Sequence, residues 1–385
     1  MDFELTERQK MLVIGLREML TKDYSKEYFR KLEDDEIWPS DVLKKMGELG
    51  YIALGVPEKD GGLGGDTVDV TLCIEEAAHQ MGGPAMAYFT AVCFGARAIA
   101  LFGTEKQKSE LLPGLMAGTS WMGLSLTEPG GGTDILAMAS KAKKDGNGSW
   151  VINGSKIFTT GAHIASHVIA VVRTSGFEEK RARGITMFLV PTNADGLDIK
   201  RIPIFTQRST GANEVFFNDV RVSEDSILGE LDKGVYALFG ILNDERIGAS
   251  AMCIGISQAA LDEAVEYAKV RTAFGRPIGQ FQAIQHSLAE CWTRLQAARY
   301  LVYRAAWLQA NNISAEMESS AAKLFASQTA VWLTNECMEV LGGYQASLDF
   351  SMNYYFRDCR YTFAPITNNA VRNLIGERLE LGKSY

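Results

Sequence analysis

The feature that most constrains this chain is the spacing of its apolar residues, which changes twice along the sequence. From residue 1 to about 119, apolar residues recur every three or four positions, as Leu12, Leu16 and Leu20 do. This is the period of an amphipathic helix. The same spacing returns over 232–385. The stripe there consists of Ile254, Leu261, Ala264, Val265 and Ala268. Both ends of the chain are therefore predicted to be helical.

Residues 120–231 follow a different pattern. Apolar positions gather there in short runs rich in β-branched and aromatic residues, separated by turn signals. The runs are 168–172, 185–190 and 215–222, and the turn signals are Asn153-Gly154 and Asp195-Gly196. The pattern predicts an N-terminal α-helical domain over 1–119, a middle antiparallel β domain over 120–231 and a C-terminal α-helical domain over 232–385. A cofactor site is expected where the domains meet, because such sites often lie between domains.

Local sequence also predicts three helix ends. Ser40 precedes a stretch with helical spacing and is expected to be its N-cap. Gly50 is expected to end that helix in the left-handed conformation. A later helix from Met317 to Leu341 is expected to stop at Gly342-Gly343.

Charge and cysteine usage limit the kind of protein. The chain has 385 residues and a net charge of -8, which disfavours a nucleic-acid partner. Its six cysteines form no Cys-x-x-Cys pair, so we expect buried free thiols in a reducing compartment. His163 and His167 stand alone, so no metal site is expected. The sequence shows neither a signal peptide nor a run of 18 apolar residues, and we predict a cytoplasmic protein.

Two glycine-rich stretches suggest a cofactor. Residues 61–65 follow a Pro-Glu-Lys-Asp turn rather than a strand, so we interpret them as a loop between helices and not as a dinucleotide fingerprint. Residues 124–134 read Leu-Ser-Leu-Thr-Glu-Pro-Gly-Gly-Gly-Thr-Asp. Three consecutive glycines let a backbone pass close to a flat ligand. The run is no P-loop, and by itself a tight turn entering a β domain explains it equally well.

The second stretch resembles the Thr-Glu-Pro-Gly-Ala-Gly-Ser-Asp signature of the acyl-CoA dehydrogenase family. Further matches follow in the same order over essentially the whole chain. They are Asn153-Gly154-Ser155-Lys156 with Phe158-Thr159-Thr160, Arg271-Thr272-Ala273-Phe274-Gly275 with Phe281-Gln282, Leu341-Gly342-Gly343, and Arg357-Asp358-Cys359-Arg360. The resemblance implies a helical domain, a small β domain and a four-helix C-terminal domain, in agreement with the three predicted units.

The resemblance also implies a function. Members of this family use FAD to remove two hydrogens from an acyl-CoA thioester, usually as tetramers. We therefore expect FAD as cofactor, an acyl-CoA substrate, an electron-transfer flavoprotein as electron acceptor, and a homotetramer or dimer.

Motif positions indicate the residues that would bind these ligands. Those expected at FAD are Leu124, Leu126, Thr127, Gly132, Thr133, Phe158, Thr160, Arg271, Phe274, Gln282, Glu339, Gly342, Gly343 and Asn368. Those expected at the substrate are Thr133, Asn243 and Arg246. Phe158 stands where the family usually has Trp, which keeps an apolar plate but loses the indole donor. Glu339 stands where Gln is usual, so one donor is lost.

The catalytic base departs from the family pattern. Most members carry a Glu near the C-terminus, and Ile366 stands at that position. Glu245, followed by Arg246, resembles the Glu-Arg segment that supplies the base from a helix in isovaleryl-CoA, long-chain and crotonobetainyl-CoA-type enzymes. Asp244 is the neighbour most easily confused with it, but adjacent helical residues point about 100° apart. The backbone N–H of Ile366 is still expected to hold the thioester oxygen.

The missing C-terminal Glu leaves other functions open. The same fold could act on a carrier-protein thioester, reduce an enoyl-CoA, or eliminate a group without net oxidation. A further alternative is a non-catalytic flavoprotein subunit of a hetero-oligomer. Glu245 could also simply pair with a nearby cation on its helix.

Overall fold

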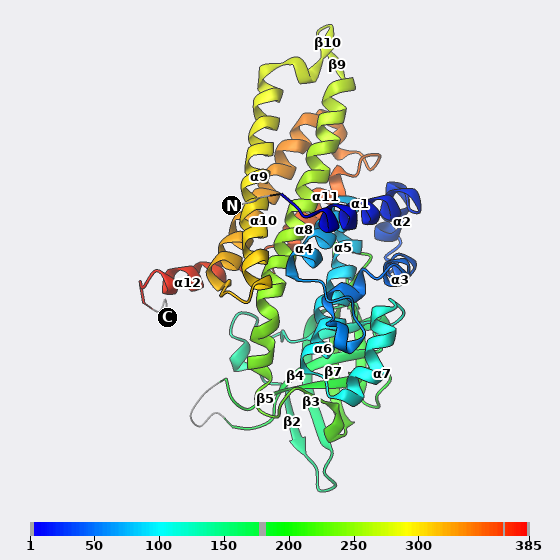
Figure 1. Ribbon diagram of the computed structural model, residues 1–385, viewed down its shortest axis with the longest axis vertical. Coiled ribbons are helices and arrows are strands. Elements are labelled where there is room, and N and C mark those ends of the chain that lie inside the picture. Colours follow the sequence, from blue (N-terminus) through cyan, green and yellow to red (C-terminus); the bar gives the residue numbers. More distant parts are fainter. Residues whose placement is uncertain (1–3, 177–181, 365, 383–385) are drawn as a thin grey trace.

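The computed structural model describes residues 4–176, 182–364 and 366–382 (Figure 1). Its N-terminal part is helical, as predicted. The helices are α1 (Glu7–Lys22), α2 (Lys26–Asp34), α3 (Ser40–Glu48), α4 (Thr67–Gln80), α5 (Gly82–Phe89), α6 (Arg97–Phe102) and α7 (Glu105–Met116). Leu16 and Leu20 of α1 are fully buried, so the predicted apolar stripe faces the core.

Polar side chains cap several of these helices. Thr6, Asp66 and Thr104 each accept a hydrogen bond from the backbone three positions later, in capping boxes that begin α1, α4 and α7. The N-cap prediction for Ser40 is wrong by one residue. Pro39 is the cap of α3, and Ser40 is its first residue. Gly50 has φ +84°, as expected for a residue that ends a helix.

One helical run crosses the N-terminal part. It consists of α5, a π-helical segment (Thr90–Ala96) and α6, and together they span Gly82–Phe102. By length and composition this run could cross a membrane, but 78% of its most apolar window is buried inside the protein. That burial is typical of a core helix. π-Helical segments often mark functional sites.

The middle part is a sheet of eight strands. They are β1 (Met122–Ser125), β2 (Lys141–Lys144), β3 (Trp150–Thr160), β4 (His167–Arg173), β5 (Ile185–Pro191), β6 (Leu197–Ile202), β7 (Ala212–Val222) and β8 (Ile227–Leu228). The order is β6-β7-β3-β2-β4-β5-β8, with β1 beside β4. Most pairs are antiparallel, as predicted, but β1 pairs with β4 in parallel, and β2 touches β4 in parallel at one position.

One predicted turn is also wrong. Asn153-Gly154 lies inside β3, where the register shifts between Ile152 and Gly154 against β7. Gly154 has φ +145°, and a Cβ there would lie 2.3 Å from Ser140 Oγ. The glycine therefore forms a β-bulge instead of a turn. Asp195-Gly196 does precede β6 as a turn, with φ +83° at Gly196.

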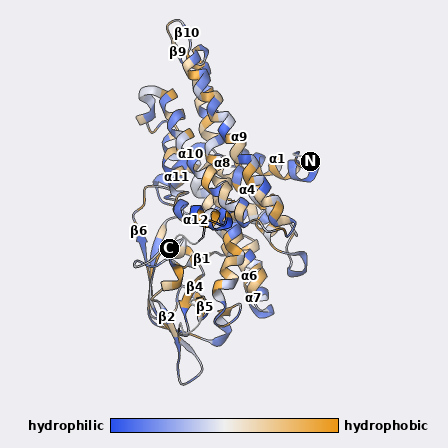
Figure 2. Ribbon diagram, turned by 90° about the vertical axis from the view of Figure 1, so that its left-hand side faces the viewer, coloured by the Kyte–Doolittle hydropathy of each residue, from blue (hydrophilic) through white to orange (hydrophobic). Residues whose placement is uncertain are grey.

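The C-terminal part contains long helices: α8 (Gly234–Val270), α9 (Gln282–Ala310), α10 (Glu316–Leu341), α11 (Met352–Tyr361) and α12 (Asn368–Arg378). Figure 1 shows α8 running from the sheet to a small hairpin of β9 (Thr272–Ala273) and β10 (Arg276–Pro277). The helix α10 ends at Gly342, whose φ is +56°, as predicted. Figure 2 shows apolar residues along α8 and α4 in the middle of the molecule. All six cysteines are free and buried, as expected.

Candidate active site

The glycine-rich loop after β1 is held by a buried ion pair that sequence reasoning missed. Lys156 Nζ lies 2.8 Å from Glu128 Oε1 and 3.0 Å from the Leu126 carbonyl oxygen. The backbone N–H groups of Ala139 and Ser140 also donate to Glu128, at 2.6 and 2.9 Å. Burial alone would raise the pKa of Glu128, but Lys156 and these N–H groups hold it below its usual value. The charge pair therefore fixes the backbone of residues 124–128, which is expected to line the flavin.

An aromatic side chain stands out from β3 next to this loop. Phe158 is 57% exposed and has φ +60°, at a bulge between Lys156 and Thr159. A bulky residue with positive φ is uncommon and often marks a functional position. The Thr159 hydroxyl is 3.0 Å from that of Ser125, which ties β3 to β1. Phe158 and Thr160 thus lie on the strand beside the glycine loop, where a flat ring could rest.

Glu245 lies on α8 and is partly buried. Burial raises the pKa of its carboxyl to about 7, although Arg246 and the Lys323 ammonium on α10 oppose the rise. The Tyr361 hydroxyl on α11 is within electrostatic range of Glu245 and within reach of the Thr160 side chain. A carboxyl with a pKa near neutrality can accept and release a proton at physiological pH. The surroundings of Glu245 thus come from three helices and the strand that carries Phe158.

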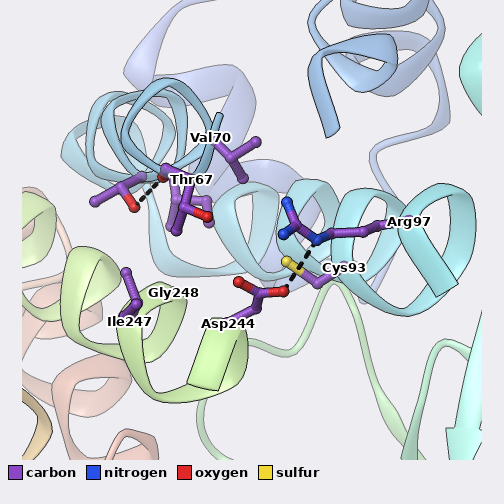
Figure 3. A pocket seen from close by; sticks show the side chains of 9 residues that line it. Thr67, Val70, Cys93, Arg97, Asp244, Ile247 and Gly248 are labelled. Atoms are coloured by element: carbon purple, nitrogen blue, oxygen red, sulfur yellow. Dashed lines mark hydrogen bonds and ion pairs between the residues drawn. The ribbon is translucent and has the colours of Figure 1, made fainter. Parts of the chain in front are cut away.

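The adjacent carboxylate, Asp244, faces elsewhere. Its Oδ2 is 3.0 Å from Arg97 Nε on α6, in a small pocket between α8, α4 and the π-helical segment (Figure 3). The two acids therefore have different partners, as the helical rotation predicts.

Two of the predicted substrate residues meet on α8. Arg246 Nη1 donates to Asn243 Oδ1 at 2.7 Å, and the buried Ser319 hydroxyl of α10 lies 3.5 Å from the same oxygen. Arg246 is 7% exposed, and its Nε has no hydrogen-bond partner among the described residues. Thr133, the third predicted substrate residue, lies in the exposed part of the glycine loop.

The segment before α12 has an unusual backbone. Ile366 has φ +41°, which is costly for a β-branched residue. Asn368, predicted at FAD, has a buried side chain whose Oδ1 accepts from Lys323 Nζ at 2.7 Å. Its Nδ2 donates to the Ser327 hydroxyl at 3.1 Å. The Asn368 side chain is therefore engaged within the protein and anchors the Ile366 segment to α10.

The remaining predicted FAD residues lie far from Glu245. Arg271 follows α8, and Phe274, 96% exposed, lies on the β9–β10 hairpin. Gln282 begins α9, while Glu339, Gly342 and Gly343 lie at the end of α10. Arg271 comes 26 residues after Glu245, which is ~39 Å along a helix. One chain therefore presents two separate groups of predicted FAD residues.

Comparison with known proteins identifies the class to which this fold and site belong. Three family models match in order: the acyl-CoA dehydrogenase N-terminal domain at residues 6–119, the middle domain at 123–220 and the C-terminal domain at 232–379. The chain belongs to the acyl-CoA dehydrogenase family. It has the fold of that family and is an FAD-dependent oxidoreductase, so the predictions of fold, cofactor and enzyme class are confirmed.

Individual relatives agree with this assignment. The chain is 37% identical to the probable acyl-CoA dehydrogenase YngJ of Bacillus subtilis, over 94% of each chain. It is 31% identical to the caffeyl-CoA reductase-Etf complex subunit CarC of Acetobacterium woodii, over 92% of this chain and 93% of the relative. The structure of butyryl-CoA dehydrogenase from Megasphaera elsdenii superposes with a TM-score of 0.93, at 32% identity, covering 99% of this chain and 100% of that one.

Proposed function

We propose that this enzyme dehydrogenates an acyl-CoA thioester between Cα and Cβ, with Glu245 as the base. The observation that carries the proposal is the position of Glu245, where burial raises its pKa to about 7 beside Lys323 and Tyr361. Such a carboxylate is matched to proton abstraction near neutral pH. The proposal places the chain in the subgroup whose base lies on a helix, with isovaleryl-CoA, long-chain and crotonobetainyl-CoA-type enzymes.

Each site residue has its own role in the proposed reaction. Glu245 takes the proton from Cα, and the electrons of that bond form the new double bond. FAD, when bound, would supply the two-electron acceptor for the hydrogen that leaves Cβ. The backbone N–H of Ile366 donates to the thioester oxygen, where negative charge develops. Arg246, held by Asn243, and Thr133 line the substrate side.

We propose that two subunits complete each flavin site. Residues 124–133 with Phe158 and Thr160 would hold the flavin ring. Arg271, Phe274, Gln282, Glu339, Gly342 and Gly343 would reach the cofactor of a neighbouring subunit, because Arg271 lies ~39 Å along α8 from Glu245. Asn368 would support the site through Lys323. This arrangement requires at least a dimer, and we propose a homotetramer built from domains 1–119, 120–231 and 232–385.

The proposed electron acceptor is an electron-transfer flavoprotein. The relative from Acetobacterium woodii is named as a subunit of a complex with Etf, which supports this partner. Six free, buried thiols suit a reducing compartment, and we propose the cytoplasm.

Glu245→Gln tests the base. Loss of a general base lowers rates by about 10²–10⁴-fold, so anaerobic bleaching of the flavin by a panel of acyl-CoA thioesters should slow by this factor. In the unmodified enzyme the rate should rise with pH through about 7, as Glu245 loses its proton. The exposed Glu266 on α8 offers a matched control, and Glu266→Gln should bleach normally. Near-normal bleaching by Glu245→Gln would show that the assignment is wrong.

A second candidate is reduction of an enoyl-CoA, favoured by the named reductase among the relatives. Glu245 would then return its proton to Cα. If this direction is physiological, photoreduced enzyme should be reoxidised by an enoyl-CoA faster than oxidised enzyme is bleached by the matching acyl-CoA. Repeating the bleaching experiment with carrier-protein thioesters shows whether the enzyme reacts faster with a thioester of CoA or of a carrier protein.

A further inference from the structure

A small pocket with a buried ion pair lies beside Asp244, the residue that precedes the proposed base. It is a cavity of about 10 Å³ between α4, the π-helical segment Thr90–Ala96, α6 and α8. Figure 3 shows the Asp244 carboxylate and the Arg97 guanidinium reaching into it beside Cys93. The volume has room for one water-sized group.

The ion pair in this pocket leaves part of its hydrogen-bonding capacity unused. Asp244 is 5% exposed, and neither of its oxygens has a well-aligned hydrogen bond within the described part of the chain. Arg97 Nε is 3.0 Å from Asp244 Oδ2, but the angle is poor and this N–H is also unsatisfied. Burial raises the pKa of Asp244, against the opposing effects of Arg97 and the nearby Gln309 amide. Buried polar groups are normally satisfied, so these atoms indicate a missing partner.

The pocket adjoins the proposed reaction site. Asp244 directly precedes Glu245 on α8. The π-helical segment touches both α8 and β1, the strand that leads into the glycine loop. Cys93 of that segment is within electrostatic range of both Asp244 and Glu245.

We propose that this pocket binds a hydroxyl group on the substrate's acyl chain, several carbons from the thioester. This inference rests on the proposed function. A hydroxyl can donate to Asp244 and accept from Arg97, so it satisfies both orphaned groups with one atom. A carboxylate would be repelled by Asp244 and an ammonium by Arg97. A methyl group would leave both unsatisfied, which is how polar sites reject apolar analogues.

Paired thioesters test the proposal. The Glu245→Gln enzyme is expected to turn over about 10²–10⁴-fold more slowly, so its dissociation constants can be compared for saturated acyl-CoAs and their ω-hydroxy counterparts with chains of about four to eight carbons. At one chain length, the hydroxylated member should bind at least tenfold more tightly. The same preference should appear in KM for flavin bleaching by the unmodified enzyme.

Three variants test whether the preference for the hydroxylated thioester depends on this pocket. Asp244→Asn and Arg97→Met should each reduce it to less than threefold. Cys93→Met fills the pocket without unpairing the charges, so it should do the same even where the charge variants fold poorly. Asp225→Asn removes an exposed carboxylate that pairs with Lys106 and should leave the preference unchanged.

Two results would overturn the proposal: equal binding of every pair by the Glu245→Gln enzyme, or a preference that survives all three pocket variants. Either outcome means that the cavity holds only water. Failure of the proposed function is distinct, because then no thioester bleaches the flavin of the unmodified enzyme, whatever its binding preference.

Discussion

At the scale of single residues, a buried cation on another helix acts on Glu245. Lys323 is 1% exposed and donates to Asn368 at 2.7 Å. Burial lowers the pKa of Lys323 to about 8, while the nearby carboxylate of Glu245 opposes this. At pH 7 most of its ammonium therefore remains charged. We interpret Lys323 as a positioning residue that keeps Glu245 ionised and anchors the segment with Ile366.

Replacing Lys323 by Met tests this interpretation. Without the ammonium, the pKa of Glu245 should rise further, because only Arg246 would still oppose burial. The pH midpoint of kcat/KM should move upward from about 7, by at least half a unit. Lys269→Met, at an exposed ion pair of α8, should leave the midpoint in place. A variant with lower activity but an unchanged midpoint would mean that Lys323 only stabilises the fold.

At the scale of elements, the first turn of α5 depends on glycine. A Cβ on Gly83 would lie 1.8 Å from Glu33 Oε1 and 2.1 Å from Ser209 Oγ. A Cβ on Gly82 would lie 2.5 Å from Asp358 Oδ2. The helix therefore begins against two buried carboxyl groups, and the N–H of Gly82 favours the charged form of Asp358.

Two Gly→Ala changes in helices should have opposite effects on thermal unfolding. Gly83→Ala should destabilise the protein by about 1–3 kcal/mol or more, because the methyl group has no room. Gly376→Ala in α12 meets no atom within 4 Å and should stabilise by up to about 1 kcal/mol through helix propensity. The unfolding temperature of each variant is measured against that of the parent. A Gly83→Ala protein as stable as the parent would show that the position has room for a methyl group.

At the scale of the whole molecule, a buried pair of carboxyls joins the three parts of the chain. Glu33 on α2 accepts from the Arg208 N–H at 2.6 Å and from the Ser209 hydroxyl at 2.5 Å. Asp358 on α11 accepts from the Gln207 N–H at 2.8 Å. Burial and the charge of Asp358 raise the pKa of Glu33 to about 8. The loop between β6 and β7 thus connects the N-terminal and C-terminal helices through a pair of buried acids, of which Glu33 holds a proton at neutral pH.

This pair should make stability depend on pH. The folded protein keeps a proton on Glu33 up to about pH 8, whereas an unfolded glutamate releases it near pH 4.3. Between these values the folded state binds more protons, so stability falls as pH rises. In Glu33→Gln, which has no proton to lose, the fall in unfolding temperature from pH 5 to pH 8 should be smaller. Glu27→Gln, at an exposed site on α2, should keep the parent slope, and an unchanged slope in Glu33→Gln would contradict this account.

Local sequence was enough to predict much of this protein. The spacing of Leu12, Leu16 and Leu20 and the β-branched runs predicted the helical, β, helical order, because apolar residues repeat with the period of the element they form. The ordered motifs predicted the family, FAD and the glycine loop. Local signals were wrong where distant partners matter: Gly154 forms a bulge because β7 and Ser140 lie against it, and β1 pairs in parallel with β4.

Tertiary structure alone decided the surroundings of the charged groups. Asp244 and Glu245 are adjacent acids in the sequence, yet one faces Arg97 and the other faces Lys323 and Tyr361. Asn368 matched a cofactor position, but its side chain is bound by Lys323 and Ser327. Burial and charge partners determine a pKa, and both are supplied by residues far away in the chain. The sequence by itself therefore determined the class of protein and the candidate acids, and only the folded chain assigned each acid its partners.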